Sequence, residues 1–71
     1  MVNFELLLEK IKKSGMTITA ITRKCNISRE TYYNRINGIG DFTASEICAL
    51  TKVLNLSRDE RDIIFFDNEV N

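Results

Sequence analysis

Five polar residues between positions 29 and 37 carry side chains that can read the edges of DNA bases. Relative to the first of them, the others lie one, four, five and eight positions along the chain, so a helix would bring all five to one side. An Arg can donate two parallel hydrogen bonds to guanine O6 and N7, an Asn can pair with adenine N6 and N7, and a Glu can accept from cytosine N4. The five residues are Arg29, Glu30, Tyr33, Asn34 and Asn37.

These side chains and their neighbours are expected to make two kinds of contact with a duplex. The Tyr33 ring can contact a thymine methyl group, and Asn37, at the end of the segment, would meet the sugar–phosphate backbone. Helix N-termini also attract phosphates, because free N–H groups and the positive end of the dipole point at the anion. We therefore expect base contacts from Arg29, Glu30, Tyr33 and Asn34, and phosphate contacts from Thr17, Lys24, Ser28 and Asn37.

A purely structural interpretation of the same segment stays open. Surface helices carry Arg and Asn for solubility alone, and two short helices joined by a tight turn also occur in bundles that bind no DNA. Tyr32 lies four residues before Ile36, which is the spacing of a core-facing pair rather than of a base contact.

Capping residues divide the chain into five short helices. Each predicted helix follows an Asn, Ser or Thr, whose side chain can accept a hydrogen bond from the first free N–H groups of a helix. Convincing strand-like alternation is nearly absent, so we predict an all-α domain, a compact bundle of five short helices within a single domain of residues 1–71. The predicted N-caps are Asn3, Thr17, Ser28, Thr43 and Ser57, and the last two open capping boxes with Glu46 and Glu60.

Apolar side chains recur at helical spacing in the first and fourth predicted helices. Residues three and four positions apart lie on one face of a helix, so each set forms an inward face. The first set is Phe4, Leu7, Leu8 and Ile11, and the second is Ile47, Leu50, Val53 and Leu54.

The second and third predicted helices form a helix-turn-helix unit over residues 17–38. Asn26 stands at the turn, and Asn tolerates a left-handed backbone better than any other residue except Gly. Gly15 ends the helix before this unit, and Gly38 ends the second helix of the unit. The apolar residues expected where the two helices cross are Ile18, Ile21, Cys25, Ile27, Tyr32 and Ile36.

The charge of the chain is zero overall but is unevenly distributed. Residues 1–40 carry seven basic and three acidic side chains, a net charge of +4, and residues 41–71 carry three basic and seven acidic ones, a net charge of −4. This polarity favours a basic face that meets nucleic acid and an acidic face on the other side.

The composition excludes most other classes of function. A chain of 71 residues without His or a C-x-x-C pair lacks the common zinc sites and any His-assisted nucleophile, and so small a domain offers little room for an enzyme pocket. We therefore expect no enzyme activity, no cofactor, no metal and no small-molecule substrate. The longest apolar run is four residues and no export signal precedes it, so we expect a cytoplasmic protein without a membrane span.

Apolar residues near the C-terminal end exceed what one small core is expected to bury. They favour self-association, and a symmetric homodimer would place two reading helices roughly 34 Å apart on DNA. Whether residues 67–71 are ordered stays open at this point. The residues expected at the interface are Ile63, Ile64, Phe65, Phe66 and Val70.

The segment from Met16 to Gly38 resembles the lambda-repressor-like (XRE) helix-turn-helix family, and in particular small Cro-like proteins of prophages in Gram-positive bacteria. Residues 27–38, ISRETYYNRING, are similar to the turn and recognition helix of the family, and residues 50–57, LTKVLNLS, to its fourth helix. The resemblance implies a repressor that binds operator DNA, usually as a dimer. Two positions depart from the pattern, since Ile18 replaces the usual Gln and Asn26 the usual Gly.

A second function stays open beside operator binding. Small Cro-like phage proteins include modulators that bind a phage repressor protein, and a neutral chain with Ile18 in place of Gln would suit that role. The apolar C-terminal end would then dock on the repressor instead of on a second copy.

Overall fold

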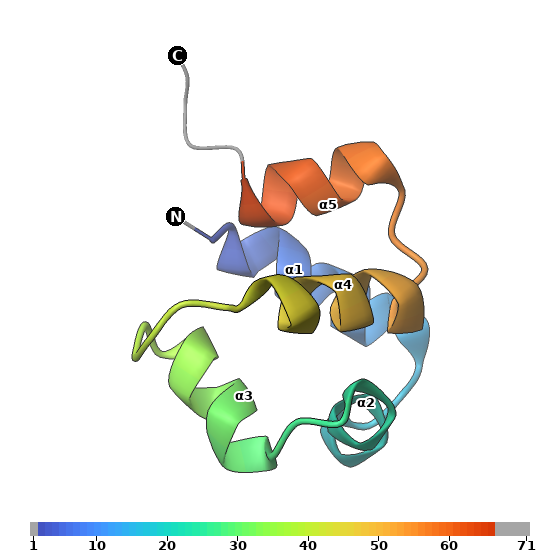
Figure 1. Cartoon of the computed structure of the whole chain (residues 1–71). Helices are drawn as coiled ribbons and strands as arrows, with labels where there is room; N and C mark the ends of the chain where they lie inside the picture. The colour runs from blue at the N-terminus through green and yellow to red at the C-terminus, as the bar shows by residue number, and fades with distance from the viewer. Residues whose placement is uncertain (1, 67–71) are drawn as a thin grey trace.

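The structure of this protein is a computed structural model that describes residues 2–66. Within this range the chain forms five α-helices and no strand, which confirms the predicted all-α fold (Figure 1). Residues 67–71, including Val70, lie outside the described residues. The helices are α1 (Phe4–Ser14), α2 (Ile18–Cys25), α3 (Arg29–Ile36), α4 (Ala44–Val53) and α5 (Arg58–Phe65).

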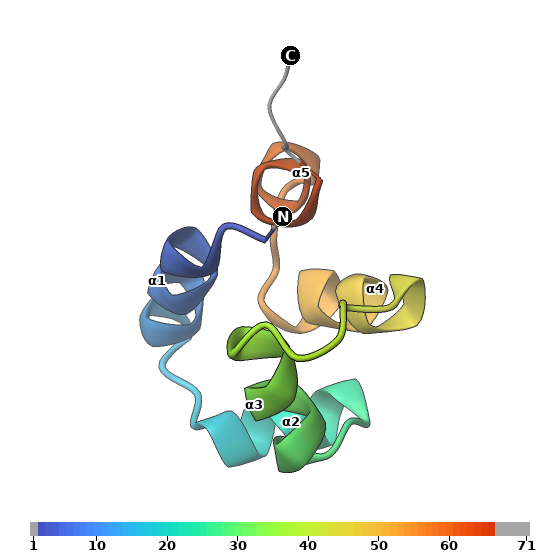
Figure 2. The same ribbon diagram turned by 90° about the vertical axis from the view of Figure 1, so that its left-hand side faces the viewer.

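The helices are arranged so that the helix-turn-helix unit and α5 occupy opposite ends of the molecule. In Figures 1 and 2, α2 and α3 lie at the bottom, α1 and α4 at the middle, and α5 at the top. α2 packs against both α3 and α4, while α5 packs against α1 and α4. The central α4 therefore connects the two ends.

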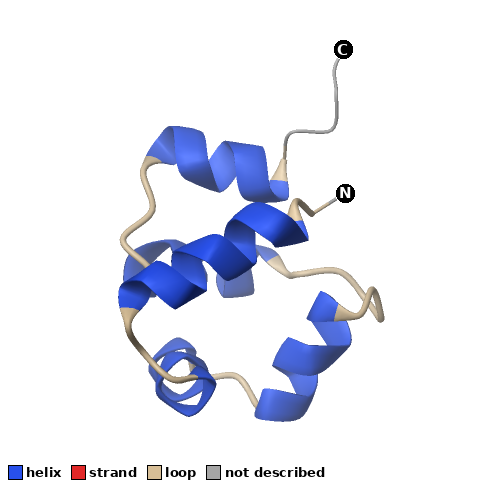
Figure 3. Cartoon of the chain, turned by 180° about the vertical axis from the view of Figure 1, so that it is seen from behind, coloured by secondary structure: helices blue, strands red, loops and turns tan. Residues whose placement is uncertain are grey.

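Local capping signals determine where each helix begins, as expected from the sequence. All five predicted caps accept a hydrogen bond from the N–H group three residues later, and both predicted capping boxes are formed. Loops of a few residues join the helices (Figure 3). The confirmed caps are Asn3, Thr17, Ser28, Thr43 and Ser57.

The core is made of apolar side chains contributed by every helix. The most deeply buried ones are Leu7, Ile21, Tyr32, Leu50 and Ile64. Beside them Phe42, from the loop before α4, packs edge-on against Phe65 with 5.4 Å between the ring centroids.

One residue of the predicted inward face of α1 points to solvent instead. Leu8 is 45% exposed, whereas Leu7 and Ile11 are buried and Leu6 packs against the core from the other side. The buried stripe of α1 is thus centred on Leu7 and extends toward Leu6, so Leu8 lies beyond its edge.

Two of the five residues predicted for an interface belong to the core. Ile64 is fully buried and Phe65 is 6% exposed, because α5 lies across the start of the chain. The N–H of Asn3 donates to the Ile64 carbonyl at 2.7 Å, and Lys10 forms an ion pair with Glu60. The prediction was wrong for Ile64 and Phe65.

The remaining described members of that set are accessible. Ile63 is 41% exposed and Phe66 is 53% exposed.

No helix among residues 2–66 combines the length and the apolar character that crossing a lipid bilayer requires.

Two leucines with opposite environments test the assignment of the core. Replacing the fully buried Leu50 with Ala should lower the free energy of unfolding by about 2–5 kcal/mol, because the change removes apolar contacts and leaves a cavity. The same replacement at the exposed Leu8 should change it by about 0.5 kcal/mol or less. Urea denaturation of both variants measures the difference, and equal losses would contradict this core.

Candidate nucleic-acid interface

The turn between α2 and α3 depends on Asn26. This residue ends α2 in the left-handed region, at φ 60° and ψ 41°, as its position in the sequence predicts. The N–H of Ile27 then donates to the carbonyl of Thr22 at 3.0 Å, which closes the end of α2. Thr22 is buried, and its hydroxyl donates to the Ile18 carbonyl at 2.9 Å. Backbone hydrogen bonds from Asn26 and Ile27 therefore hold the turn and fix how α3 leaves α2.

One side of α3 is held in the core and another is accessible. Tyr32 is 2% exposed, whereas Tyr33 is 42% exposed and meets the Tyr32 ring edge-on at a centroid distance of 5.0 Å. Arg29 and Glu30 are exposed in the first turn, and Asn34 is partly buried. The structure thus brings the four predicted base-contacting residues together on α3.

Three of the four predicted phosphate-contacting residues are helix caps. Thr17 and Ser28 are the N-caps of α2 and α3, and Asn37 is the exposed C-cap of α3. The Ser28 hydroxyl accepts from the Thr31 N–H and donates to the Thr31 hydroxyl, both at 2.9 Å. Ser28 is therefore engaged in capping the start of α3.

Lys24 is separated from this set. It is exposed near the end of α2 and borders a shallow depression of about 380 Å³ between α2 and α4. The other residues around this depression are Ser45, Cys48, Ala49, Lys52 and Val53.

An ion pair that the sequence did not reveal joins α3 to α4. The Arg35 Nε atom lies 3.1 Å from Glu46 Oε1, and its Nη2 atom lies 3.3 Å from Glu46 Oε2. Arg35 also donates from Nη1 to the Ile39 carbonyl at 3.4 Å. The capping box marked Glu46 as a helix-start residue, but no local signal paired it with Arg35.

The protonation of Glu46 follows from these contacts. Partial burial acts to raise the pKa of this carboxyl, but the hydrogen bond from the Thr43 N–H and the ion pair with Arg35 outweigh it. The pKa of Glu46 therefore lies below its ordinary value of 4.5, and the ion pair is charged at neutral pH.

Burial, with a smaller effect of Tyr33, raises the pKa of the Tyr32 hydroxyl. This hydroxyl therefore stays neutral at neutral pH, as a core residue should.

The chemistry available at this surface is recognition by hydrogen bonding. An exposed guanidinium, carboxylate and phenol and a partly buried carboxamide lie within two turns of one helix. No group of three or more His, Cys, Asp or Glu that could hold a metal ion occurs in the part of the chain that the structure describes.

Comparison with known protein families gives a match over most of the chain. A family model described as helix-turn-helix, of the XRE type, matches residues 7–61, which is more than half of the chain and contains α2, α3 and α4 entirely. No curated protein and no solved structure gives a significant match.

The role of Asn26 in the turn can be tested by two substitutions. Asn26→Gly should keep the turn, because Gly adopts the left-handed region without a steric penalty. Asn26→Ala should be less stable than the Gly variant by about 1–2 kcal/mol, since its Cβ crowds the neighbouring backbone in that region. Urea denaturation of the two variants provides the measurement. An Ala variant as stable as the Gly variant would show that the turn does not require this conformation.

Proposed function

We propose that this chain, which belongs to the helix-turn-helix family, regulates transcription by reading a specific operator sequence with α3. Membership of the family makes it a DNA-binding regulatory domain. The finer assignment, a Cro-like repressor of phage or prophage origin, is part of the proposal, and so are its base contacts and its dimeric state.

The observation that carries the proposal is the set of exposed polar side chains on α3. Arg29 and Glu30 stand in the first turn and Tyr33 one turn later, on a helix that is held by Tyr32. A recognition helix contacts base edges with its N-terminal residues, while the adjoining helix lies across the sugar–phosphate backbone. Glu30 would accept from cytosine and would repel the phosphates of a misplaced duplex, which adds selectivity to the Arg29 contact.

The distribution of charge supports the same orientation. α5 carries two basic and three acidic side chains, a net charge of −1, and lies at the opposite end of the molecule from α3 (Figures 1 and 2). Arg29 and Arg23 lie on the helix-turn-helix unit at the other end. The phosphate backbone of DNA would therefore attract the α3 end of the domain and repel the α5 end. This difference would orient the domain, although its net charge is zero, as it approaches the duplex.

Substitutions on α3 separate reading of bases from attachment to the backbone. Arg29→Ala should weaken binding to the operator by about 1–3 kcal/mol and relax the preference at one base position. Asn37→Ala should instead weaken binding to all sequences by a similar factor, because a phosphate contact carries no sequence information. Mobility shifts with duplexes from the promoter region of its own gene, at several salt concentrations, provide the measurement.

The control for these variants is Arg58→Ala, which removes a positive charge from α5 at the far end of the molecule. It should leave operator affinity unchanged. Arg29→Ala binding like the wild-type protein to every duplex would contradict base reading by α3.

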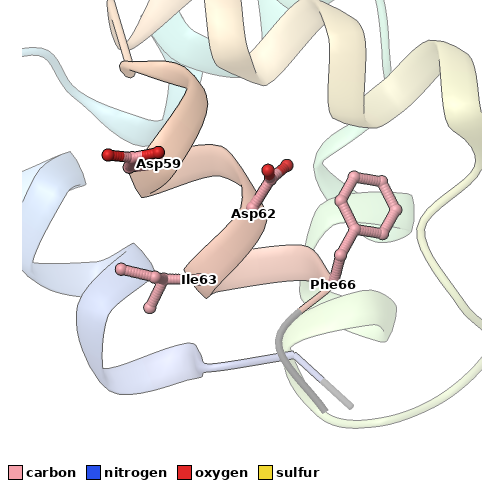
Figure 4. Close-up of a pocket in the computed structure, with 4 residues that line it drawn as sticks. All are labelled: Asp59, Asp62, Ile63 and Phe66. Carbon is pink, nitrogen blue, oxygen red and sulfur yellow. The ribbon is translucent and has the colours of Figure 1, made fainter. Parts of the chain in front are cut away.

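The exposed face of α5 supports self-association. Asp59, Asp62, Ile63 and Phe66 follow one another at helical spacing along this face (Figure 4). They border an open depression of about 530 Å³. Arg61 pairs with Asp62 at 2.8 Å, and its guanidinium carbon lies 6.0 Å from the centre of the Phe66 ring. An apolar pair with charges at its edge is the composition of a small interface.

The proposed occupant of this face is a second copy of the chain, as in a symmetric regulator that binds two half-sites. The runner-up is a phage repressor protein, in which case the chain would act as a modulator. Ile18, where the family usually has Gln, favours the runner-up, because Ile cannot donate a hydrogen bond to a phosphate.

Sedimentation of the purified protein distinguishes these partners. Phe66→Ser should raise the dissociation constant of a homodimer by about tenfold or more, because burying an aromatic side chain contributes about 1.5–3 kcal/mol. Leu8→Ser, at an exposed apolar residue of α1, is the matched control and should leave the constant unchanged. A wild-type protein that stays monomeric at high concentration contradicts the homodimer. A change in the DNA shift produced by a co-expressed repressor would then favour the modulator.

A further inference from the structure

We propose that Arg35 and Glu46 form a clamp that sets the orientation of α3 and of the loop after it for DNA binding, and that Arg35 itself does not contact DNA. The inference deepens the proposed function and rests on it, because it assigns a positioning role to a residue of the reading helix. An Arg on such a helix would otherwise be taken for a phosphate or base contact.

The Arg35–Glu46 ion pair has a fixed geometry and differs in this from a mobile ion pair on the surface. Two nitrogen atoms of Arg35 face the two carboxylate oxygens of Glu46 at 3.1 and 3.3 Å. The side chains are only 20% and 11% exposed. A two-point contact between a planar guanidinium and a carboxylate fixes direction as well as distance. The last turn of α3 is thereby held against the first turn of α4.

Glu46 is itself held in place by the start of α4. Its Oε1 atom accepts from the Thr43 N–H at 3.0 Å, and its own N–H donates to the Thr43 hydroxyl at 3.2 Å. The carboxylate that orients Arg35 is thus anchored by a capping box. α4 also packs against α2 and α5. The ion pair therefore fixes the orientation of α3 relative to the rest of the domain.

The loop between α3 and α4 lies against the same guanidinium. Nη1 of Arg35 donates to the Ile39 carbonyl at 3.4 Å, and the Ile39 N–H donates to the Asn34 carbonyl at 2.7 Å. A Cβ atom added at Gly40 would lie 2.7 Å from Arg35 Nη1, at a backbone φ of +76°. The left-handed backbone therefore favours Gly at position 40, and a side chain there would also displace the Arg35 guanidinium from its present position. Ile39, in this loop three residues after the end of α3, is 60% exposed.

The charges of the clamp cancel each other. A phosphate would have to compete with Glu46 for the guanidinium of Arg35, so Arg35 adds little to the attraction of the backbone. Conversely, Arg35 neutralises a carboxylate close to the reading helix, which would otherwise repel the duplex. Loss of either partner should nevertheless weaken binding, because α3 is then no longer held in its orientation, although the two changes alter the net charge in opposite directions.

Binding of operator DNA by three variants tests the clamp. Arg35→Met removes the guanidinium and keeps an apolar stem, Glu46→Gln keeps the capping box but not the charge, and the third variant carries both changes. Each single variant should bind on the order of tenfold more weakly, and the double variant no more weakly than the weaker single one, because the two residues act as a unit. The slope of log affinity against log salt should stay unchanged. Arg58→Met on α5 is the matched control for the lost charge.

A direct contact between Arg35 and a phosphate would give a different pattern. Arg35→Met would then reduce the salt slope by about one, while Glu46→Gln, which removes a negative charge, would bind as well as the wild-type protein or better. That pattern overturns the proposal.

Amide hydrogen exchange without DNA gives a second readout that is independent of the proposed function. Both single variants should speed exchange at Gly38 and Ile39 and in the last turn of α3, and should leave α1 and α5 unchanged. Unaltered exchange in this loop would overturn the clamp even if binding is weakened. If exchange responds as expected but the wild-type protein ignores all duplexes, then the proposed function fails, and with it the role of the clamp in binding.

Discussion

Burial of the Tyr32 ring is the contact on which the remaining features of the reading surface depend. In α3, a helix described in full, Tyr32 is the one residue that the fold buries, and Ile36 is only partly covered. The helix is therefore attached to the bundle by a narrow stripe, and the rest of its surface carries polar side chains. With a single buried anchor, α3 could swing about its contact line. The left-handed Asn26 turn at one end and the Arg35–Glu46 pair at the other restrict that motion.

The charged residues of the domain perform two separate tasks. Glu46 and Glu60 each serve twice, as the closing residue of a capping box and as the partner of a cation from another helix. For Glu60, the hydrogen bond from Lys10, together with that from the Ser57 N–H, holds the pKa below its ordinary value, so this contact between α1 and α5 is charged at neutral pH. Arg29 and Glu30, by contrast, are exposed at the start of α3, where charge can serve recognition. A net charge of zero is thus compatible with a charged reading surface.

Local features of this chain were predictable from the sequence, and contacts between distant residues were not. The caps at Asn3, Thr17 and Ser28 follow from a hydrogen bond across three residues, so the residue types alone identify them. Arg35 and Glu46 lie 11 positions apart, and Lys10 and Glu60 lie 50 apart, so these pairs arise only when the helices pack. The same limit explains the error at Ile64 and Phe65. Four consecutive apolar residues indicate that some are buried, but which of them face the core depends on where α5 meets α1 and α4.

In the proposed mode of binding, the exposed face of α3, and not the face of α5, meets DNA. Amide chemical shifts of the ¹⁵N-labelled protein, followed during titration with duplexes that tile the promoter region of its own gene, test it most directly. We expect that one duplex shifts the amides of Arg29–Ile36 and of the N-terminal turn of α2, with the signals of Asp59, Asp62 and Ile63 almost unchanged. Shifts confined to α5, or no shift with any duplex, would contradict it.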